Sequence, residues 1–141
     1  MKNILIVSNS DTCRSRMAQE ILNSFGRGMK ISTAGVLVGN SVPDVVCQVM
    51  EQNGYDFSRR KPCDVATYAQ QTWDYVITLC PEAEEVQKEM QGVVRKYVSF
   101  NFADPFRGGI HADDEQEERV VALYDAMHKE LYEFFRNELM E

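Results

Sequence analysis

The fold can be worked out from one stretch near the amino terminus, Val7-Ser8-Asn9-Ser10-Asp11-Thr12-Cys13-Arg14-Ser15. An apolar run, residues 4–7, precedes this stretch, and the apolar side chains after it recur at helical spacing from Met17 to Leu22. The pattern predicts a buried strand, a loop and a helix in direct succession. Because N–H groups of the loop and of the first helical turn are free at such a junction, we expect an anion site there.

Arg14 occupies the last position of this loop, where its guanidinium can donate to two oxygens of a tetrahedral anion. We therefore expect the bound partner to be a tetrahedral oxyanion. The candidate anion-binding residues are Asn9, Ser10, Asp11, Thr12, Cys13, Arg14 and Ser15.

Hydrophobic spacing along the rest of the chain predicts alternating strands and helices. Strands are expected over residues 2–7, 31–35, 73–80 and 95–100, and helices over residues 13–25, 43–53, 64–71, 82–90 and a long segment ending near 135. This order predicts a single α/β domain over residues 1–141, with three α-β-α layers around a doubly wound parallel sheet of four strands. Ligands of such sheets bind at the carboxyl ends of the strands, where the loop at residues 8–14 also lies.

Composition narrows the possible functions. The chain has 141 residues, of which 44% are hydrophobic and 26% charged, as is ordinary for a soluble protein. It lacks a membrane-spanning apolar run and a signal-peptide pattern, so we expect a cytoplasmic protein with no membrane partner. The net charge of −7 argues against nucleic-acid binding. The four cysteines form no C-x-x-C pair, so neither a metal site nor a cofactor is expected, and the oligomeric state is left open.

The loop resembles the phosphate loop of the low-molecular-weight protein tyrosine phosphatases and the thioredoxin-coupled arsenate reductases. That loop has the pattern C-x5-R-S and usually runs C-x-G-N-x-C-R-S. The last three positions of the pattern match Cys13, Arg14 and Ser15. The other positions differ: Ser8 stands at the nucleophilic cysteine, Ser10 at the loop glycine and Asp11 at the loop asparagine. Three differences together favour natural divergence over a single engineered replacement.

Two further segments carry the resemblance. Thr33-Ala34-Gly35 is similar to the end of the second strand in this family, and Asp104-Pro105 follows the last predicted strand, where the family carries its Asp-Pro. The resemblance implies the fold of that family, with Arg14 holding the anion and Asp104 as the general acid. It also implies that the bound partner is phosphate, arsenate, a similar oxyanion or a phosphorylated protein. In the family the loop cysteine attacks phosphorus as a thiolate.

The serine at position 8 changes the catalytic mechanism that the resemblance implies. A cysteine at a helix amino terminus beside an arginine ionises readily, whereas a serine hydroxyl needs an adjacent base. We therefore expect oxyanion binding with the thiol mechanism impaired or lost. Two alternatives stay open: a non-catalytic module that binds phosphate or a phosphopeptide through Arg14, and an active phosphatase with Ser8 as nucleophile, Asp11 as base and Asp104 as acid.

The remaining predictions concern the charge of the loop and the redox chemistry of the cysteines. An Asp11 carboxylate pointing inward, roughly 4 Å from a bound anion, would oppose it by ~1 to ~4 kcal/mol, depending on the local dielectric. The arsenate reductases carry a redox cysteine after the third strand and another seven residues later. Cys80 matches the first of these, whereas Gln87 occupies the second, which leaves one member of the disulfide cascade. The chain length and the run Ile77-Thr78-Leu79-Cys80 nevertheless make the arsenate reductases the closer branch. Cys80 and Cys13 remain redox candidates, either as a disulfide or as buried reduced thiols.

Overall fold

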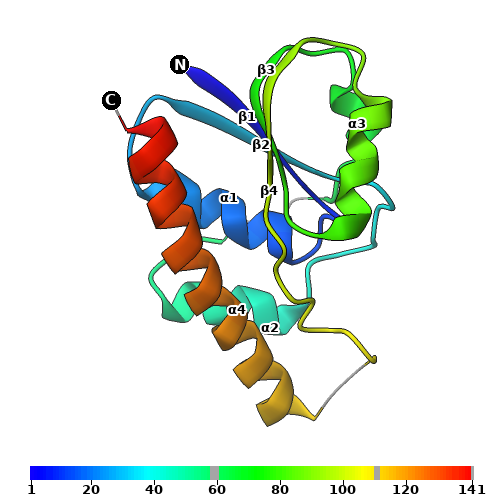
Figure 1. The fold of residues 1–141 in the computed structure, drawn as a ribbon. Coiled ribbons are helices and arrows are strands. Elements are labelled where there is room, and N and C mark those ends of the chain that lie inside the picture. The colour runs from blue at the N-terminus through cyan, green and yellow to red at the C-terminus, as the bar shows by residue number, and fades with distance from the viewer. Residues whose placement is uncertain (58–60, 110–111, 141) are drawn as a thin grey trace.

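The protein is an α/β structure built on one parallel sheet, and the computed structural model describes residues 1–57, 61–109 and 112–140. The strands lie in the spatial order β2-β1-β3-β4. Helices α1, α2 and α4 lie on one side of the sheet and the short α3 on the other (Figure 1). The bounds are β1 (Lys2–Ser8), α1 (Arg14–Ser24), β2 (Met29–Gly35), α2 (Asp44–Gln52), β3 (Trp73–Thr78), α3 (Val86–Glu89), β4 (Val94–Ser99) and α4 (Asp113–Phe134). The predicted α/β class and four-stranded parallel sheet are confirmed.

Strand β1 lies in the middle of two hydrophobic cores. Ile4 and Ile6 face the core shared with α1, α2 and α4, whereas Leu5 and Val7 face the core on the opposite side. All four side chains are fully buried. Covering on both faces explains why this strand is apolar throughout instead of alternating with polar residues.

The layer on the α3 side is thinner than the sequence predicted. The helix expected over 64–71 is the single 3₁₀ turn η1 (Val65–Tyr68), and the helix expected over 82–90 divides into the 3₁₀ turn η2 (Pro81–Glu85) and α3. Acidic side chains occupy most of η2, and the buried side chains of η1, η2 and α3 are Val65, Ala83 and Val86. Such a small apolar face cannot hold a long helix against the sheet.

Helix α4 packs mainly against α1 and α2 and meets the sheet only near its carboxyl end. There the Phe134 ring lies edge-on to Tyr75 of β3, with the ring centroids 5.7 Å apart. A π-helical turn, η3 (Phe135–Leu139), follows α4. The apolar stripe of α4 thus packs mainly on the two neighbouring helices, and it shares a core with buried side chains of β1 and β3.

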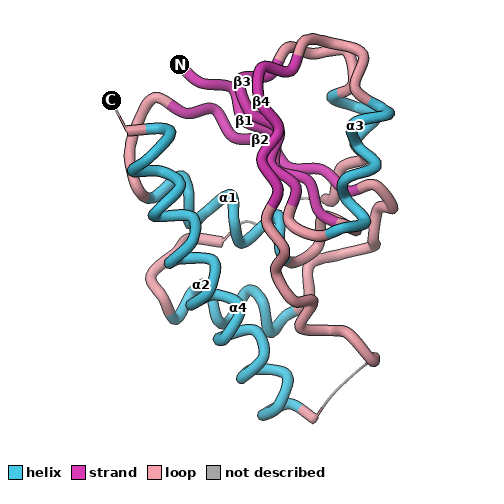
Figure 2. Tube along the Cα trace, viewed as in Figure 1, coloured by secondary structure: helices cyan, strands magenta, loops and turns pink. Residues whose placement is uncertain are grey.

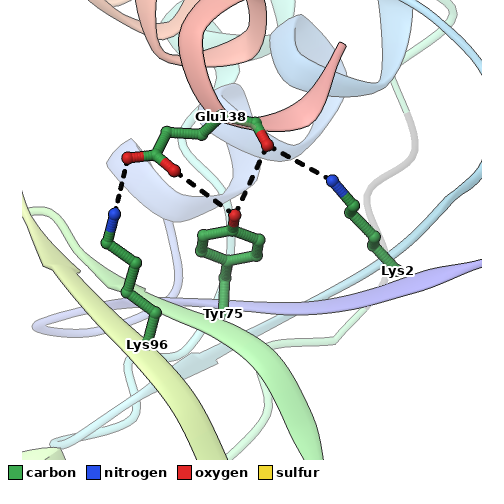
Figure 3. A network of polar contacts seen from close by, with 4 residues as sticks. All are labelled: Lys2, Tyr75, Lys96 and Glu138. Atoms are coloured by element: carbon green, nitrogen blue, oxygen red, sulfur yellow. Dashed lines mark hydrogen bonds and ion pairs between the residues drawn. The ribbon is translucent and has the colours of Figure 1, made fainter. Parts of the chain in front are cut away.

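The side chain and carbonyl of Glu138 fasten the end of the chain to three strands (Figure 3). Lys96 of β4 forms an ion pair with the Glu138 carboxylate, and Lys2 of β1 donates to the Glu138 carbonyl oxygen at 3.2 Å. The Tyr75 hydroxyl of β3 donates to the same carbonyl at 3.4 Å. We call these four residues the terminal clamp.

The loops after β1, β3 and β4 lie together at the carboxyl edge of the sheet (Figure 2). Backbone hydrogen bonds join each of them to the next. The N–H of Leu79, after β3, donates to the carbonyl of Val7, at the end of β1, at 3.0 Å, and the N–H of Phe102, after β4, donates to the carbonyl of Leu79 at 2.9 Å. The loop at 8–13 and the loop that carries Asp104 are therefore held side by side. No helix in the described part of the chain is both long enough and apolar enough to cross a bilayer.

Candidate anion-binding site

Three successive carbonyl groups at the end of β1 and the start of the following loop bond to one neighbour, the segment 36–39. The carbonyls of Ser8, Asn9 and Ser10 accept from the N–H groups of Val36, Leu37 and Gly39 at 3.3, 2.8 and 2.9 Å. In a planar trans peptide, the N–H of the next residue points the opposite way. The N–H groups of residues 9–11 are thus directed away from segment 36–39.

Most of these N–H groups are unused. No hydrogen bond between described residues engages the backbone N–H of Asn9, Ser10, Thr12, Cys13 or Arg14. Such N–H groups at a helix amino terminus, next to an arginine side chain, are typical of an anion site.

A cavity of about 160 Å³ lies against the loop and gathers the three side chains that the sequence singled out for chemistry, Ser8, Arg14 and Asp104. Its other lining residues are Asn9, Ser10, Thr12, Cys13, Pro43 and Phe106. The volume is several times that of a water molecule, so the cavity has room for a tetrahedral oxyanion. Of the predicted anion-binding residues, Asp11 and Ser15 lie outside the lining.

Arg14 joins this cavity to the loop after β4. Its Nη1 donates to the carbonyl oxygen of Phe102 at 2.9 Å, and its side chain is buried. A guanidinium has five N–H donors, so others remain for a ligand. On the same loop, Oδ1 of Asp104 accepts from the N–H of Phe106 at 2.9 Å. Sequence reasoning missed the Phe102 contact because a backbone carbonyl carries no residue-type signal.

Asp11 is turned away from the cavity. It is fully buried and is the only non-glycine residue with positive φ, 57°, in the described part of the chain. Its Oδ1 accepts from the Ser15 hydroxyl at 2.7 Å and its Oδ2 from the N–H of Cys63 at 2.9 Å. The Asp11 carboxylate therefore points away from the cavity. The electrostatic repulsion of a bound anion, which was expected for an inward-pointing Asp11, does not apply to this orientation.

Ser8 lies between the cavity and this buried carboxylate. Its hydroxyl donates to the Ser15 hydroxyl at 2.8 Å and accepts from the N–H of Asp11 at 3.3 Å. The side chain is only 2% exposed, at the bottom of the cavity. Ser15 thus hydrogen-bonds within the loop instead of lining the cavity.

The comparisons with known proteins agree with this geometry. The family described as low molecular weight phosphotyrosine protein phosphatase matches residues 3–138. The chain belongs to this family.

Relatives of two kinds are similar to this family member. A probable low molecular weight protein-tyrosine-phosphatase, EpsP of Ralstonia nicotianae, is 27% identical over 135 residues, which cover 89% of this chain and 93% of that protein. A glutaredoxin arsenate reductase of Synechocystis is 29% identical over 80 residues, 57% of this chain and 61% of that protein, so the match spans less than two thirds of its length. The solved structure of an arsenate reductase in the phosphate binding state has a TM-score of 0.73 at 20% identity, over 96% of this chain and 98% of that one. The branch to which this chain is closer stays a prediction.

The cysteines of this low molecular weight phosphatase family member are all free thiols. Burial raises the pKa of Cys13 to about 12 despite the opposing charge of Arg14, and its Sγ contacts Met17 Sδ at 3.8 Å. Burial likewise raises the pKa of Cys80, which is 1% exposed, and Arg14 again opposes the shift. Of the two arrangements left open for Cys13 and Cys80, the structure has the buried reduced thiols.

A second cavity, of about 420 Å³, shares Asn9, Arg14 and Asp104 with the first and extends over the loops after β3 and β4. Its remaining lining is Pro81, Glu82, Asn101, Phe102, Ala103 and Arg107. This second cavity has room for a larger chemical group attached to the bound anion. In the described ranges, 1–57, 61–109 and 112–140, no cluster of three or more His, Cys, Asp or Glu side chains is arranged to hold a metal ion.

Proposed function

We propose that this low molecular weight phosphatase family member binds phosphate, arsenate or a similar oxyanion at loop 8–15, without the thiol chemistry of its relatives. The observation that carries the proposal is a set of loop N–H groups, beside Arg14 at one small cavity, that donate to no other described residue. Free backbone donors, a helix amino terminus and a guanidinium together favour a tetrahedral anion. The phosphate binding state named for the similar arsenate reductase structure supports the choice of ligand.

The absence of a reactive thiol at the loop supports the second half of the proposal. Ser8 occupies the head of the loop, and burial raises the pKa of Cys13, which also lines the small cavity, to about 12. A thiol with that pKa is almost fully protonated at neutral pH and is a poor nucleophile. The structure offers Cys80 no better environment, because it is buried and its pKa is also raised.

The larger cavity supports a ligand in which the oxyanion is part of a bigger molecule, as in a phosphorylated protein. A pure binding module and an enzyme differ in one respect only: the module holds such a ligand without turnover.

Calorimetric titration with inorganic phosphate and with arsenate tests the proposal, using wild type, Arg14→Ala and the control Arg119→Ala. Arg119 is an exposed residue of α4 that pairs with Glu115 in the same helix. Because a hydrogen bond to a charged group contributes about 1.5–3 kcal/mol, Arg14→Ala should weaken binding by roughly ten- to a hundredfold.

Wild type and Arg119→Ala should bind alike, and circular dichroism checks that every variant is folded. Wild type that binds neither anion, or Arg14→Ala that binds as tightly as wild type, would overturn the proposal.

A further inference from the structure

We propose that Ser8 is an oxygen nucleophile toward phosphate monoesters and that its proton passes through Ser15 to Asp11. This inference rests on the proposed oxyanion binding at the same loop. We call the chain of hydroxyls and carboxylate formed by Ser8, Ser15 and Asp11 the proton relay.

The hydrogen bonds of the proton relay have a fixed direction. An ionised carboxylate can only accept, so Ser15 must donate to Asp11 Oδ1 across their 2.7 Å contact. A hydroxyl has one proton, so Ser15 must then accept from Ser8 across their 2.8 Å contact. Every proton in the chain points from the cavity toward the carboxylate.

The carboxylate at the end of the proton relay is held firmly. Asp11 is fully buried, its Oδ2 accepts from the N–H of Cys63 at 2.9 Å, and its own N–H donates back to Ser8 Oγ at 3.3 Å. Ser15 is also fully buried. Proton transfer along prearranged short hydrogen bonds needs no reorganisation of water, which is the condition for general base catalysis through an intermediate group.

In the first half of the reaction, a monoester is held by the loop N–H groups and Arg14. Ser8 Oγ bonds to phosphorus while the bond from phosphorus to the ester oxygen breaks. The Ser8 proton moves to Ser15 and the Ser15 proton to Asp11, while Asp104, in its acid form, gives a proton to the leaving oxygen. The products are an alcohol or phenol and phosphorylated Ser8.

In the second half, water attacks phosphorus and Asp104, now a carboxylate, takes the water proton. The bond between phosphorus and Ser8 Oγ breaks, and the Asp11 proton returns through Ser15 to Ser8. Phosphate leaves, and all three groups are restored. Asp104 lines both cavities, so it lies where it can meet either the leaving group or the water. Its Oδ1 accepts from the N–H of Phe106, and no described residue hydrogen-bonds to Oδ2.

The variant Asp11→Asn tests the proton relay, with Asp64→Asn as matched control. Asp64 lies next to Cys63, and its side chain accepts from the N–H of Ala66 outside the relay. An amide at position 11 has an oxygen for only one of its two donors, Ser15 or Cys63, and cannot accept a proton as a carboxylate does.

The assay follows release of p-nitrophenol from p-nitrophenyl phosphate, phosphorylation of Ser8 by peptide mass mapping after acid quench, and phosphate affinity by calorimetry. Wild type should release p-nitrophenol and carry a phosphoryl group on Ser8, and Ser8→Ala should do neither. Asp11→Asn should lose roughly a hundredfold or more in kcat, within the range expected for a lost general base. Its phosphate affinity should stay equal or rise, because a negative charge is removed, and Asp64→Asn should match wild type in both.

Each other outcome overturns a named part of the account. Wild type that binds phosphate but releases no p-nitrophenol overturns the nucleophile and leaves the proposed function standing. Turnover in Asp11→Asn equal to wild type overturns the proton relay. Wild type that does not bind phosphate overturns the proposed function and the inference together. If Asp11→Asn does not fold, Ser15→Ala cuts the same relay, and unchanged kcat in that variant overturns it equally.

Discussion

The hydroxyl of Ser8 lies at the amino end of α1, beside Arg14 and the free N–H groups of its own loop. A helix amino terminus and a nearby cation stabilise a negative charge on a side chain at this position. They help a thiol far more than a hydroxyl, because a thiol pKa can fall to about 3.5–7.5 in such a place. The surroundings at position 8 thus remain suited to a thiolate.

Replacing Ser8→Cys should therefore create or raise phosphatase activity. We expect hydrolysis of p-nitrophenyl phosphate to increase by about tenfold or more over wild type, since the new thiolate needs no general base. The control is Ser24→Cys at the carboxyl end of the same helix, where the dipole disfavours a thiolate. Absence of any gain, even with Asp11→Asn and Ser10→Gly added, would show that the family's loop is wrongly aligned with residues 8–15.

At the scale of single residues, the sequence predicted the position of the loop because the motif consists of consecutive residues. Cys13, Arg14 and Ser15 are consecutive, and the strand and helix on either side are plain in the apolar spacing. The contacts of Arg14 with the Phe102 carbonyl and of Asp11 with the Cys63 N–H were not predictable. Both partners are backbone groups distant in the sequence, and only the folded chain brings them there.

The shape of the loop depends on the end of β2. A Cβ atom on Gly35 would lie 2.8 Å from the backbone carbon of Ser10 and 2.9 Å from the backbone N of Asp11. Backbone atoms cannot move aside as a flexible side chain can, so only glycine allows β2 to lie this close to the loop.

Gly35→Ala should therefore displace the loop and weaken phosphate binding, by roughly tenfold or more, with a loss of about 1–3 kcal/mol of stability from overpacking. Calorimetry and thermal denaturation measure the two effects. Lys30→Ala, an exposed change in the same strand, is the control and should leave both unchanged. Wild-type affinity in Gly35→Ala would mean that the loop does not depend on this contact.

Sequence reasoning at the scale of elements succeeded where apolar periodicity is strong and failed where it is weak. The strands were found within one or two residues, and α1, α2 and α4 were identified as helices. The segments around η1 and η2 were predicted as longer helices, because charged residues such as Glu82 and Glu84 favour helix locally. Their small buried faces, which only the tertiary structure defines, limit them to short turns.

The terminal clamp connects the segment after α4 to β1, β3 and β4 and so joins distant parts of the molecule (Figure 3). The hydrogen bond from Lys96 is the main cause that lowers the pKa of Glu138. A carboxyl whose pKa is lower in the folded state stabilises that state above its usual pKa of about 4.3, and loses this effect as pH falls.

Glu138→Gln should accordingly lower the melting temperature slightly at pH 7, and the difference from wild type should vanish in acid. The effect is small because the ion pair is exposed to solvent. Thermal denaturation across a pH series measures it, with Glu133→Gln, an exposed neighbour in α4, as control. A difference that persists unchanged in acid would mean that Glu138 acts through packing and not through its charge.

The central claim is that loop 8–15 is an oxyanion site, and a crystal structure of the wild-type protein with phosphate tests it most directly. The account predicts one phosphate in the small cavity, with its oxygens at hydrogen-bond distance, about 2.7–3.2 Å, from the Arg14 guanidinium and from N–H groups of the loop. The Asp11 carboxylate should still accept from Ser15 and Cys63. An empty cavity at saturating phosphate, or an Asp11 side chain that has turned into it, would contradict the account.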